Sequence, residues 1–420
     1  MSDNWLSRIK RFDRRIIMQA IAHIINALGF SMSYPFLSIY LHTERNYSMS
    51  VVGVVFLILG VARTIGPLVS GALCDRFGRR RILIAAPAGN IIFNLALAYS
   101  IYRESSLPIM VIFLFVIYFA SSFYLAAAET IITDITPPAL HSEAYSLIRI
   151  AQNIGWMIGP AIGAWLVKTP YSLFFCLTAV AMTFVLLISI VYSPETMNPP
   201  EPGEHDEAQS SLGLVFNHKR FVFFNILFLL ILMVSSQLVS TLSVYVTTDL
   251  QISRGTLGNA YALNGLIIIL LQAPVIAFLA RVSFAARLAA GALFYAVGYT
   301  GMAFISGPLG LYICMTILTF GEILVMHTTM IATARYAPKH AIGRFFGMLG
   351  LTRGIGLTVG PFIGSFAYDH FVKDSLLGSS AGSLAMWGSL SLTSFVAAIL
   401  FMTAKHPELR NSVDDPPPDM

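Results

Sequence analysis

Two acidic side chains, Glu129 and Glu322, stand inside long apolar runs of the sequence. Glu322 lies about 13 residues into its run, near the middle of a helix that rises about 1.5 Å per residue. An acid kept away from water becomes neutral by taking up a proton, as a proton carrier must. Glu322 therefore either carries protons or forms a structural pair with a nearby arginine. Glu129, near the end of its run, either lines a cavity, where it assists with protons, or simply reaches water.

Three arginines and a histidine also lie in apolar runs: Arg63, Arg149, Arg353 and His327. A charge at this depth is costly and by default indicates function. The arginines either neutralise buried acids or attract an anionic substrate. Arg63 is the deepest, whereas Arg149 and Arg353 lie nearer the ends of their runs, where contacts between helices explain them equally well. His327 is five residues from Glu322 and so on another helical face; it is either a packing residue or a substrate contact.

The remaining candidate substrate contacts are Asn26, Tyr34, Asn153, Gln237 and Asn264. Membrane helices also use amides to hold neighbouring helices together, so packing is the competing explanation for each amide.

Patterns for other kinds of chemistry are missing from the sequence. No Gly-Lys pair of a phosphate-binding loop occurs, and the His, Cys and Glu residues do not have metal-ligand spacing. We therefore expect no enzyme activity, no metal and no cofactor, with a proton gradient as the energy source. The basic N-terminus is typical of a membrane anchor and not of a nucleic-acid-binding arm. The expected partners are a small-molecule substrate, protons and the lipid bilayer.

The elements that position these residues are predicted to be membrane helices. The chain is 56% hydrophobic and 11% charged, with a mean hydropathy of +0.74, whereas soluble domains carry roughly a quarter charged residues. Its apolar runs are about 20 residues or longer, as helices across a core of about 30 Å require, and not the segments of about ten residues found in a β-barrel.

Twelve such runs predict an all-α membrane protein with twelve transmembrane helices in two pseudo-symmetric bundles of six. We expect spans near residues 15–42, 50–72, 81–102, 108–133, 142–167, 170–193, 221–248, 255–280, 284–306, 309–334, 342–369 and 381–404. The polar, proline-rich segment 194–220 is predicted to be a cytoplasmic linker. It separates an N-terminal bundle, 1–193, from a C-terminal bundle with a short tail, 221–420.

The distribution of basic residues predicts the orientation. Eighteen lie in segments placed inside and five in segments placed outside when the N-terminus is cytoplasmic. Positive charge favours the cytoplasmic side, so both termini are predicted to lie there.

An internal repeat supports the two bundles. The first motif is Gly155, Gly159, Pro160 and Gly163, and the second is Gly356, Gly360, Pro361 and Gly364. Each member of the second follows its counterpart by 201 residues. Small residues four apart give a flat face for a neighbouring helix, and proline bends the span. Repeated halves are typical of secondary transporters, whose substrate site lies between the halves.

The loop after the second span runs from Gly71 to Arg81 and contains Asp75, Arg76, Gly78 and Arg79. It resembles the cytoplasmic signature loop of the major facilitator superfamily, G-x3-D-x2-G-[RK]-[RK], at every required position. The likeness extends over the whole chain through span count, linker and repeat.

The resemblance implies that this loop is a cytoplasmic gate in which Arg79 pairs with an acid at the end of the fourth span. Asp134 is the acid available there. The competing interpretation is that the arginines only anchor the topology. The glycine motif of the fifth span and the first span resemble the drug:proton antiporter branch, although Asn26 stands where many members have an aspartate. A coupling acid must then lie elsewhere.

The sequence therefore predicts a monomeric, proton-coupled transporter in a bacterial inner membrane that exports drugs or other small molecules by alternating access. The alternatives are a carrier of an organic anion, sugar or other metabolite, by symport or uniport, and a lipid flippase.

Overall fold

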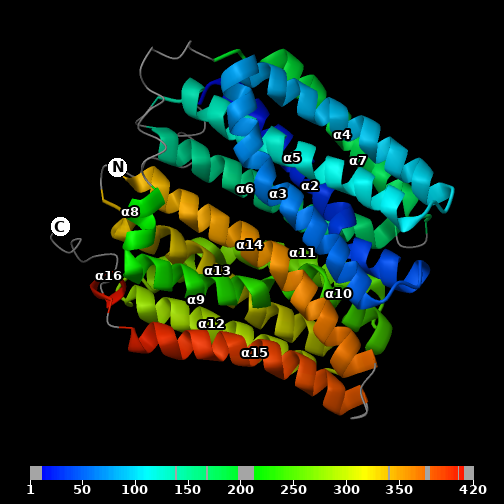
Figure 1. The fold of residues 1–420 in the computed structure, drawn as a ribbon, viewed down its shortest axis with the longest axis vertical. Helices are drawn as coiled ribbons and strands as arrows, with labels where there is room; N and C mark the ends of the chain where they lie inside the picture. Colours follow the sequence, from blue (N-terminus) through cyan, green and yellow to red (C-terminus); the bar gives the residue numbers. More distant parts are fainter. Residues whose placement is uncertain are drawn as a thin grey trace. The chain divides into compact units, whose positions relative to one another are not determined.

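The computed structural model describes residues 12–137, 140–166, 169–196, 212–338, 341–373, 379–404 and 406–410, and the regular structure of these residues is helical (Figure 1). The first half contains α2 (Arg14–Ile39), a π-helical turn (Tyr40–Glu44), α3 (Met49–Phe77), α4 (Arg79–Tyr102), α5 (Leu107–Ile135), α6 (His141–Trp165) and α7 (Ser172–Tyr192).

The second half contains α8 (Leu212–Asn217), α9 (Lys219–Ser235), a 3-10 turn (Ser236–Val239), α10 (Thr241–Val244), a π-helical turn (Tyr245–Asp249), α11 (Arg254–Phe278), α12 (Phe284–Met302), α13 (Pro308–Tyr336), α14 (Ile342–Tyr368), a π-helical turn (Asp369–Lys373), α15 (Ser379–Thr403) and α16 (Pro407–Arg410).

Each predicted span falls on one long helix, except 221–248, which covers α9, α10 and the short turns beside them. Within the described ranges, ten helices are long and apolar enough to cross a membrane, and α6 and α12 are not among them. The first half of helix α6 carries its polar and charged residues, and α12 is short and rich in alanine and glycine. The all-α, multi-pass membrane fold is confirmed, while the count of twelve spans stays a prediction.

Contacts within the chain define two compact units. Unit 1 comprises Met1–Leu37 and Val61–Pro199, and unit 2 comprises Ser38–Gly60 and Pro200–Met420. The start of the second span thus groups with the second half, which sequence patterns did not indicate. Most of the predicted linker, residues 197–211, lies outside the described residues. The division at 193 and 220 stays a prediction.

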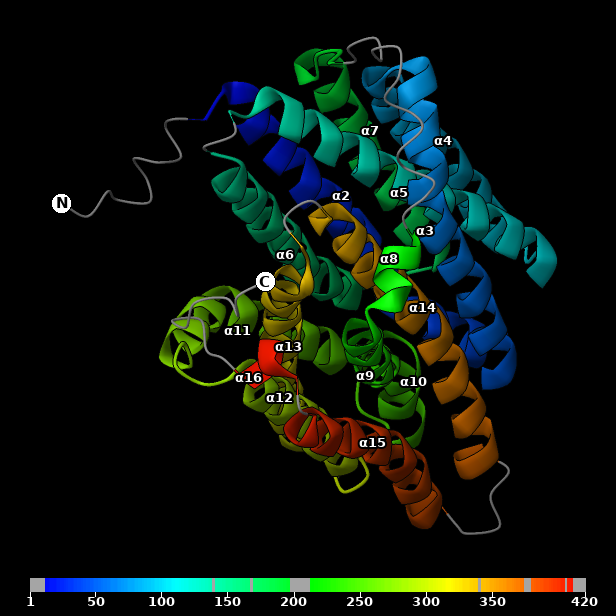
Figure 2. The same ribbon diagram turned by 60° about the vertical axis from the view of Figure 1, so that its left-hand side comes forward.

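The helix bounds repeat as the glycine motifs do. The offset of 201 residues carries Leu107–Ile135 of α5 onto Pro308–Tyr336 of α13. An offset of 205 carries the π-helical turn Tyr40–Glu44 onto Tyr245–Asp249. Packing repeats too: α4 lies against α5 and α7 in unit 1, and α12 lies against α13 and α15 in unit 2 (Figure 2).

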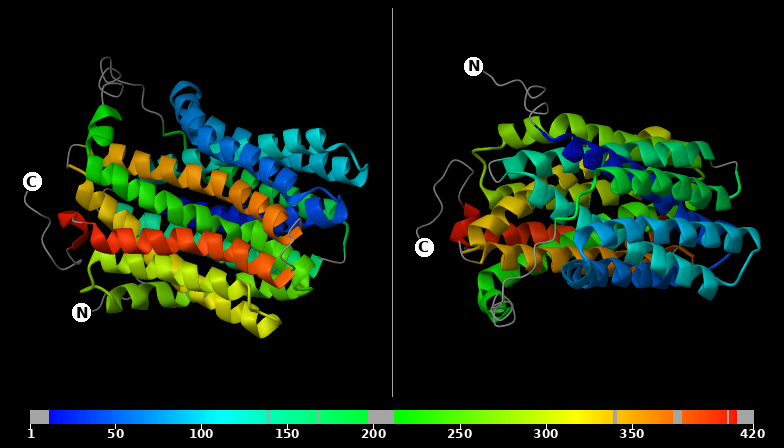
Figure 3. Two further views of the ribbon diagram at one scale, coloured as in Figure 1. Left: turned by 60° about the horizontal axis from the view of Figure 1, so that its bottom comes forward. Right: turned by 90° about the horizontal axis from the view of Figure 1, so that it is seen from above.

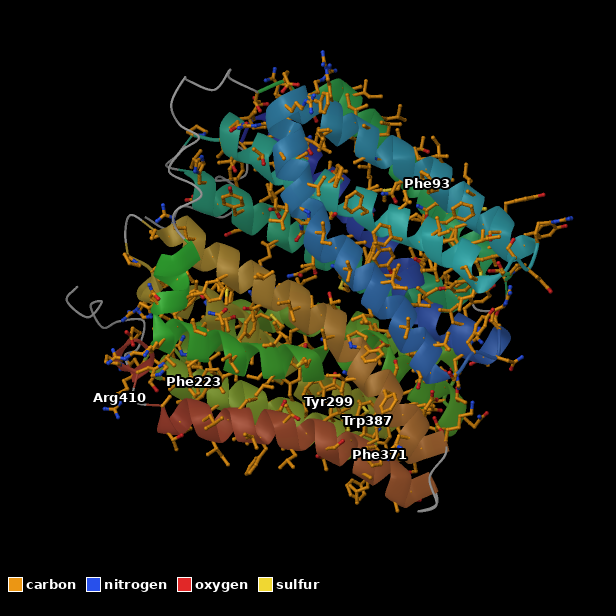
Figure 4. All side chains as sticks on the ribbon, viewed as in Figure 1. Phe93, Phe223, Tyr299, Phe371, Trp387 and Arg410 are labelled. Carbon is orange, nitrogen blue, oxygen red and sulfur yellow. The ribbon has the colours of Figure 1, made fainter. Side chains whose placement is uncertain are left out.

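Aromatic side chains fill the interior of unit 2. Helix α15 runs beside α9 and α12 (Figure 3). Between α12 and α15, the buried rings of Tyr299 and Trp387 stack with their centroids 5.3 Å apart (Figure 4). Stacked rings of this kind hold two helices in a fixed register.

Candidate functional site

The loop between α3 and α4 is held by Glu195, an acid that follows α7. Gly78 has a φ of 93°, in the region that favours glycine, and a Cβ there would lie 2.6 Å from a Glu195 carboxylate oxygen. That carboxylate accepts hydrogen bonds from the backbone N–H groups of Arg79 at 3.0 Å and Arg80 at 3.3 Å. Glu195 therefore caps the N-terminus of α4 with negative charge. Sequence reasoning missed this residue, although an acid directly after the sixth apolar run was a usable signal.

The predicted partner of Arg79 is present in the structure. The Arg79 side chain forms an ion pair with Asp134 at the end of α5, and the Thr196 hydroxyl donates to Asp134 Oδ2 at 2.5 Å. Arg80 donates through Nε to the carbonyl oxygen of Ser193 at 2.8 Å. These contacts tie α4 to α5 and to the end of α7 within unit 1. The role of the loop as a gate stays a prediction.

The other members of the signature loop contribute less to this arrangement. Arg76 is exposed, with its guanidinium carbon 5.2 Å from the centroid of the Phe77 ring. The side chain of Asp75 lies outside what the structure describes, while its backbone belongs to α3. Gly71 makes no close helix contact among the described residues. Gly71 is exposed, and nothing lies within 4 Å of where its Cβ would be, because no described neighbour packs on that face of α3.

The first glycine motif packs α6 against α2. It comprises Gly155, Gly159, Pro160 and Gly163. A Cβ on Gly155 would lie 2.5 Å from the carbonyl oxygen of Ile24, and one on Gly159 would lie 2.8 Å from that of Leu28. The Ser31 hydroxyl donates to the Gly155 carbonyl oxygen at 3.1 Å. The two backbones thus approach closely only because these positions lack side chains.

The second motif packs α14 against α9 and the turn that follows it. It comprises Gly356, Gly360, Pro361 and Gly364. A Cβ on Gly360 would lie 2.7 Å from the carbonyl oxygen of Met233. The fully buried Gln237 donates through Nε2 to the Gly360 carbonyl oxygen at 2.7 Å. The amide of Gln237 is therefore engaged in helix packing, and its predicted contact with substrate stays a prediction.

In the interior of unit 1, Arg63 on α3 lies among aromatic rings. Its guanidinium carbon is 5.3 Å from the centroid of the Phe30 ring, and a guanidinium N–H donates to the Tyr34 hydroxyl. The rings of Tyr118 and Trp156 lie with centroids 5.2 Å and 5.7 Å from that of Phe30. We call Phe30, Tyr34, Tyr118 and Trp156 the aromatic cluster. The structure joins two predicted candidates and adds three rings that sequence reasoning did not single out.

A small cavity of about 20 Å³ with a mostly apolar lining lies among α2, α4, α5 and α7 of unit 1. Its lining includes Asn26, Asn90 and Asn94, together with three rings of the aromatic cluster. Asn90 donates to the Ser121 hydroxyl at 3.2 Å, and Asn94 donates to Asn90 Oδ1 at 3.1 Å. Asn26 thus lines a pocket, as a ligand contact would, and the other two amides bond to one another. Asn90 and Asn94 are not among the candidates that the sequence predicts.

In unit 2 the structure brings Glu322 and Asn264 together. Asn264 on α11 donates through Nδ2 to Glu322 Oε2 at 3.1 Å and to the Thr319 hydroxyl at 2.9 Å, both on α13. Glu322 is half-buried. Glu322 thus accepts a hydrogen bond from a neutral amide on the facing helix α11.

The repeat relates the Arg63 site of unit 1 to the Glu322 site of unit 2. The offset of 201 residues carries Arg63 to Asn264 and Ser121 to Glu322. The same pair of helices in each half thus presents a base in unit 1 and an acid in unit 2. The glycine motifs have the same residues in both halves. They therefore do not predict that one half carries an arginine and the other half a glutamate.

The remaining candidates are placed as follows. Arg149 and Asn153 are half-buried on α6, and His327 is half-buried on α13. Arg353 on α14 donates through Nη2 to the sulfur of Met326 at 3.4 Å, and Glu129 is exposed on α5. Their substrate and proton roles stay predictions.

A polar cluster in unit 2 was not anticipated. The buried carboxylate of Asp369, just after α14, accepts from the backbone N–H groups of Met49 at 3.1 Å and Ser50 at 2.6 Å, and from the Ser50 hydroxyl at 2.7 Å. Asp369 thereby caps α3. Glu44, a few residues before α3, accepts a hydrogen bond from Arg254 at 2.9 Å. These contacts explain why Ser38–Gly60 groups with unit 2. An acid at the end of the eleventh apolar run was the only signal in the sequence.

Comparison with known proteins identifies the family. The model of the Major Facilitator Superfamily matches residues 20–361. The chain is 23% identical to the uncharacterized MFS-type transporter YhjO of Bacillus subtilis, over 91% of this chain and 93% of that protein. It is 24% identical to a Na(+), Li(+), K(+)/H(+) antiporter of Planococcus maritimus, over 84% of this chain and 89% of the relative. It is 22% identical to a multi-drug resistance efflux pump PmrA homolog of Lactococcus lactis, over 80% and 84%.

Solved structures agree on the fold. The nucleoside transporter NupG aligns with a TM-score of 0.75 and 14% identity, over 93% of this chain and 98% of that one. At this identity the likeness concerns the fold alone. The family model covers most of the sequence, and the helical repeat and the signature loop agree with it. The chain therefore belongs to the major facilitator superfamily of membrane transporters.

Proposed function

We propose that this transporter exports a small molecule in exchange for protons by alternating access, with Glu322 as the coupling acid. The contact of Glu322 with Asn264 carries the proposal. It provides an acid in the middle of α13 whose charged form is hydrogen-bonded by a neutral amide, without any need for a metal, a cofactor or a covalent step. In this scheme Glu322 takes up a proton when the site is open to the outside and releases it when the site is open to the cytoplasm.

Relatives support exchange as the transport mode. An alkali cation/proton antiporter and a multidrug efflux pump are among the proteins similar to this chain. We infer a bacterial inner membrane location, with both termini cytoplasmic, from the bacterial relatives and the distribution of basic residues. A monomer is the expected working unit.

The test uses the full chain in proteoliposomes with an imposed pH gradient and an internal pH dye. Lipophilic cations, organic anions, sugars and alkali cations are added in turn. We expect at least one class to evoke proton movement in the natural protein. Glu322→Gln, which keeps the shape and the hydrogen bond but cannot be ionised, should abolish it. Glu129→Gln serves as the matched control and should reduce it less.

Proton movement that persists undiminished in Glu322→Gln would overturn the coupling role. Substrate movement without protons would instead indicate a uniporter, and transport of lipids alone would indicate a flippase.

A second candidate is the carriage of an organic anion. Arg63, a base within the membrane-spanning part of α3, is the observation that favours it. Under both candidates the protein works as a transporter and not as an enzyme.

A further inference from the structure

The guanidinium of Arg63 cannot escape to the membrane surface along its own helix. Arg63 is 14 residues from each end of α3, which spans Met49–Phe77. At about 1.5 Å per residue, each end is roughly 21 Å away, well beyond the reach of an arginine side chain. Arg63 is half-buried, so part of it remains accessible. The position of Arg63 in the middle of α3 therefore keeps its charge far from both ends of the helix.

Its described partners are neutral. The guanidinium lies over the face of Phe30 and donates to the Tyr34 hydroxyl. The ion pairs found among the described residues join other arginines to acids: Arg79 to Asp134, Arg220 to Glu408 and Arg254 to Glu44. A ring face and one hydroxyl replace only part of the hydration that a guanidinium loses. The planar fork of Arg63 retains donors that suit a carboxylate.

The fold itself does not require a base here. The offset of 201 residues carries Arg63 to Asn264 on α11, and the offset of 205, which carries the first residue of α3 onto the first residue of α11, carries it to Ile268. With either offset, the helix of unit 2 has a neutral residue at the corresponding position. The base is a property of unit 1 alone, which favours a ligand contact over a scaffold function.

The aromatic cluster defines the rest of the ligand. Tyr34 lies with its ring centroid 4.9 Å from Phe30 and 5.9 Å from Tyr118, and Trp156 lies 6.3 Å from Tyr34. Tyr34 and Tyr118 are buried, whereas Phe30 and Trp156 are half-buried and keep part of their rings accessible. A ligand held by Arg63 would thus meet an aromatic wall beside its charge.

We propose that Arg63 and the aromatic cluster form a subsite in unit 1 for an aromatic carboxylate. The carboxylate accepts two hydrogen bonds from the Arg63 guanidinium, and the ring packs against the half-buried Phe30 and Trp156, which lie against Tyr34 and Tyr118. This inference rests on the proposed function, because it names the class of molecule that the transporter carries.

The test compares three probes of one shape: 3-phenylpropionate, 3-phenylpropanol and 3-phenylpropylammonium. Each is titrated into the full chain in nanodiscs, and binding is followed by intrinsic tryptophan fluorescence, with Trp156→Phe identifying the signal from the cluster. We expect the carboxylate to bind at least roughly tenfold more tightly than the alcohol, and the ammonium to bind most weakly.

Arg63→Gln should weaken carboxylate binding by roughly 30-fold or more while leaving the alcohol unchanged, because a buried charge pair loses one partner. Arg63→Lys should retain part of the affinity. Equal binding of the carboxylate to the natural protein and to Arg63→Gln would overturn the proposal, as would preference for the ammonium. If Arg63→Gln does not fold, the affinities of the three probes for the natural protein and for Arg63→Lys test the subsite instead. A carboxylate that binds no more tightly than the alcohol would then overturn the proposal.

The two proposals can fail separately. Loss of proton movement in Glu322→Gln with intact carboxylate binding supports both. Proton-coupled transport of cations without carboxylate binding overturns only the subsite, and carboxylate binding without proton coupling overturns only the coupling role.

Discussion

Substitution of Gly360 by alanine tests whether the repeated glycine motif sets the distance between two helices. The added Cβ would lie 2.7 Å from the carbonyl oxygen and 2.8 Å from the Cα of Met233, and it would collide with the Ser236 hydroxyl. Carbon contacts are comfortable at about 3.5–4.0 Å, so α14 must move by roughly 1 Å. The carbonyl oxygen of Gly360 also accepts the 2.7 Å hydrogen bond from Gln237, which such a shift would stretch.

The expected cost follows from these contacts. Overpacking of a tight interface costs about 1–3 kcal/mol, and a weakened hydrogen bond within the membrane costs about another 1 kcal/mol. Gly360→Ala should therefore lower the free energy of unfolding by about 2–4 kcal/mol. Gly350→Ala is the matched control on the same helix, because nothing lies within 4 Å of the place its Cβ would occupy. It should be neutral, or stabilising by up to about 1 kcal/mol through helix propensity.

Thermal unfolding in detergent, followed by the loss of monodisperse protein, compares the two variants directly. Gly159→Ala in the first half, where a Cβ would lie 2.8 Å from the Leu28 carbonyl oxygen, should behave like Gly360→Ala. Equal unfolding temperatures for Gly360→Ala and Gly350→Ala would refute the argument. That result would mean that α14 yields to a methyl group and that the motif has another purpose.

Two further contacts yield predictions. The Arg79–Asp134 pair, with side chains 24% and 26% exposed, should give a coupling energy of about 0.5–1 kcal/mol in a double-mutant cycle with alanine, measured by unfolding; additive effects would mean that the ion pair contributes nothing. Asp369→Asn should weaken the cap of α3 by about 0.5–2 kcal/mol and speed amide hydrogen exchange at Met49 and Ser50, whereas unchanged exchange there would rule out the cap as a constraint on that helix end.

The candidate sites were predictable to different degrees. The pairing of Arg79 with Asp134 was expected because the resemblance to the major facilitator superfamily implies an acid partner at the end of the fourth span. Arg63 and Glu322 were selected because ionisable groups are rare at membrane depth. Their surroundings were not predicted, since Phe30, Trp156 and Thr319 are ordinary residues of membrane helices and carry no signal of their own.

By itself the sequence determined the all-helical membrane fold, the approximate helix positions and the repeat of 201 residues, because length, hydropathy and spacing are local properties of the chain. Only the tertiary structure decided that Asn264 meets Glu322, that Glu195 caps α4 and that Asp369 draws Ser38–Gly60 into unit 2. Each of these contacts joins residues far apart in the chain. Their meeting depends on how helices rotate and slide as their faces pack, and many packings share the same apolar pattern.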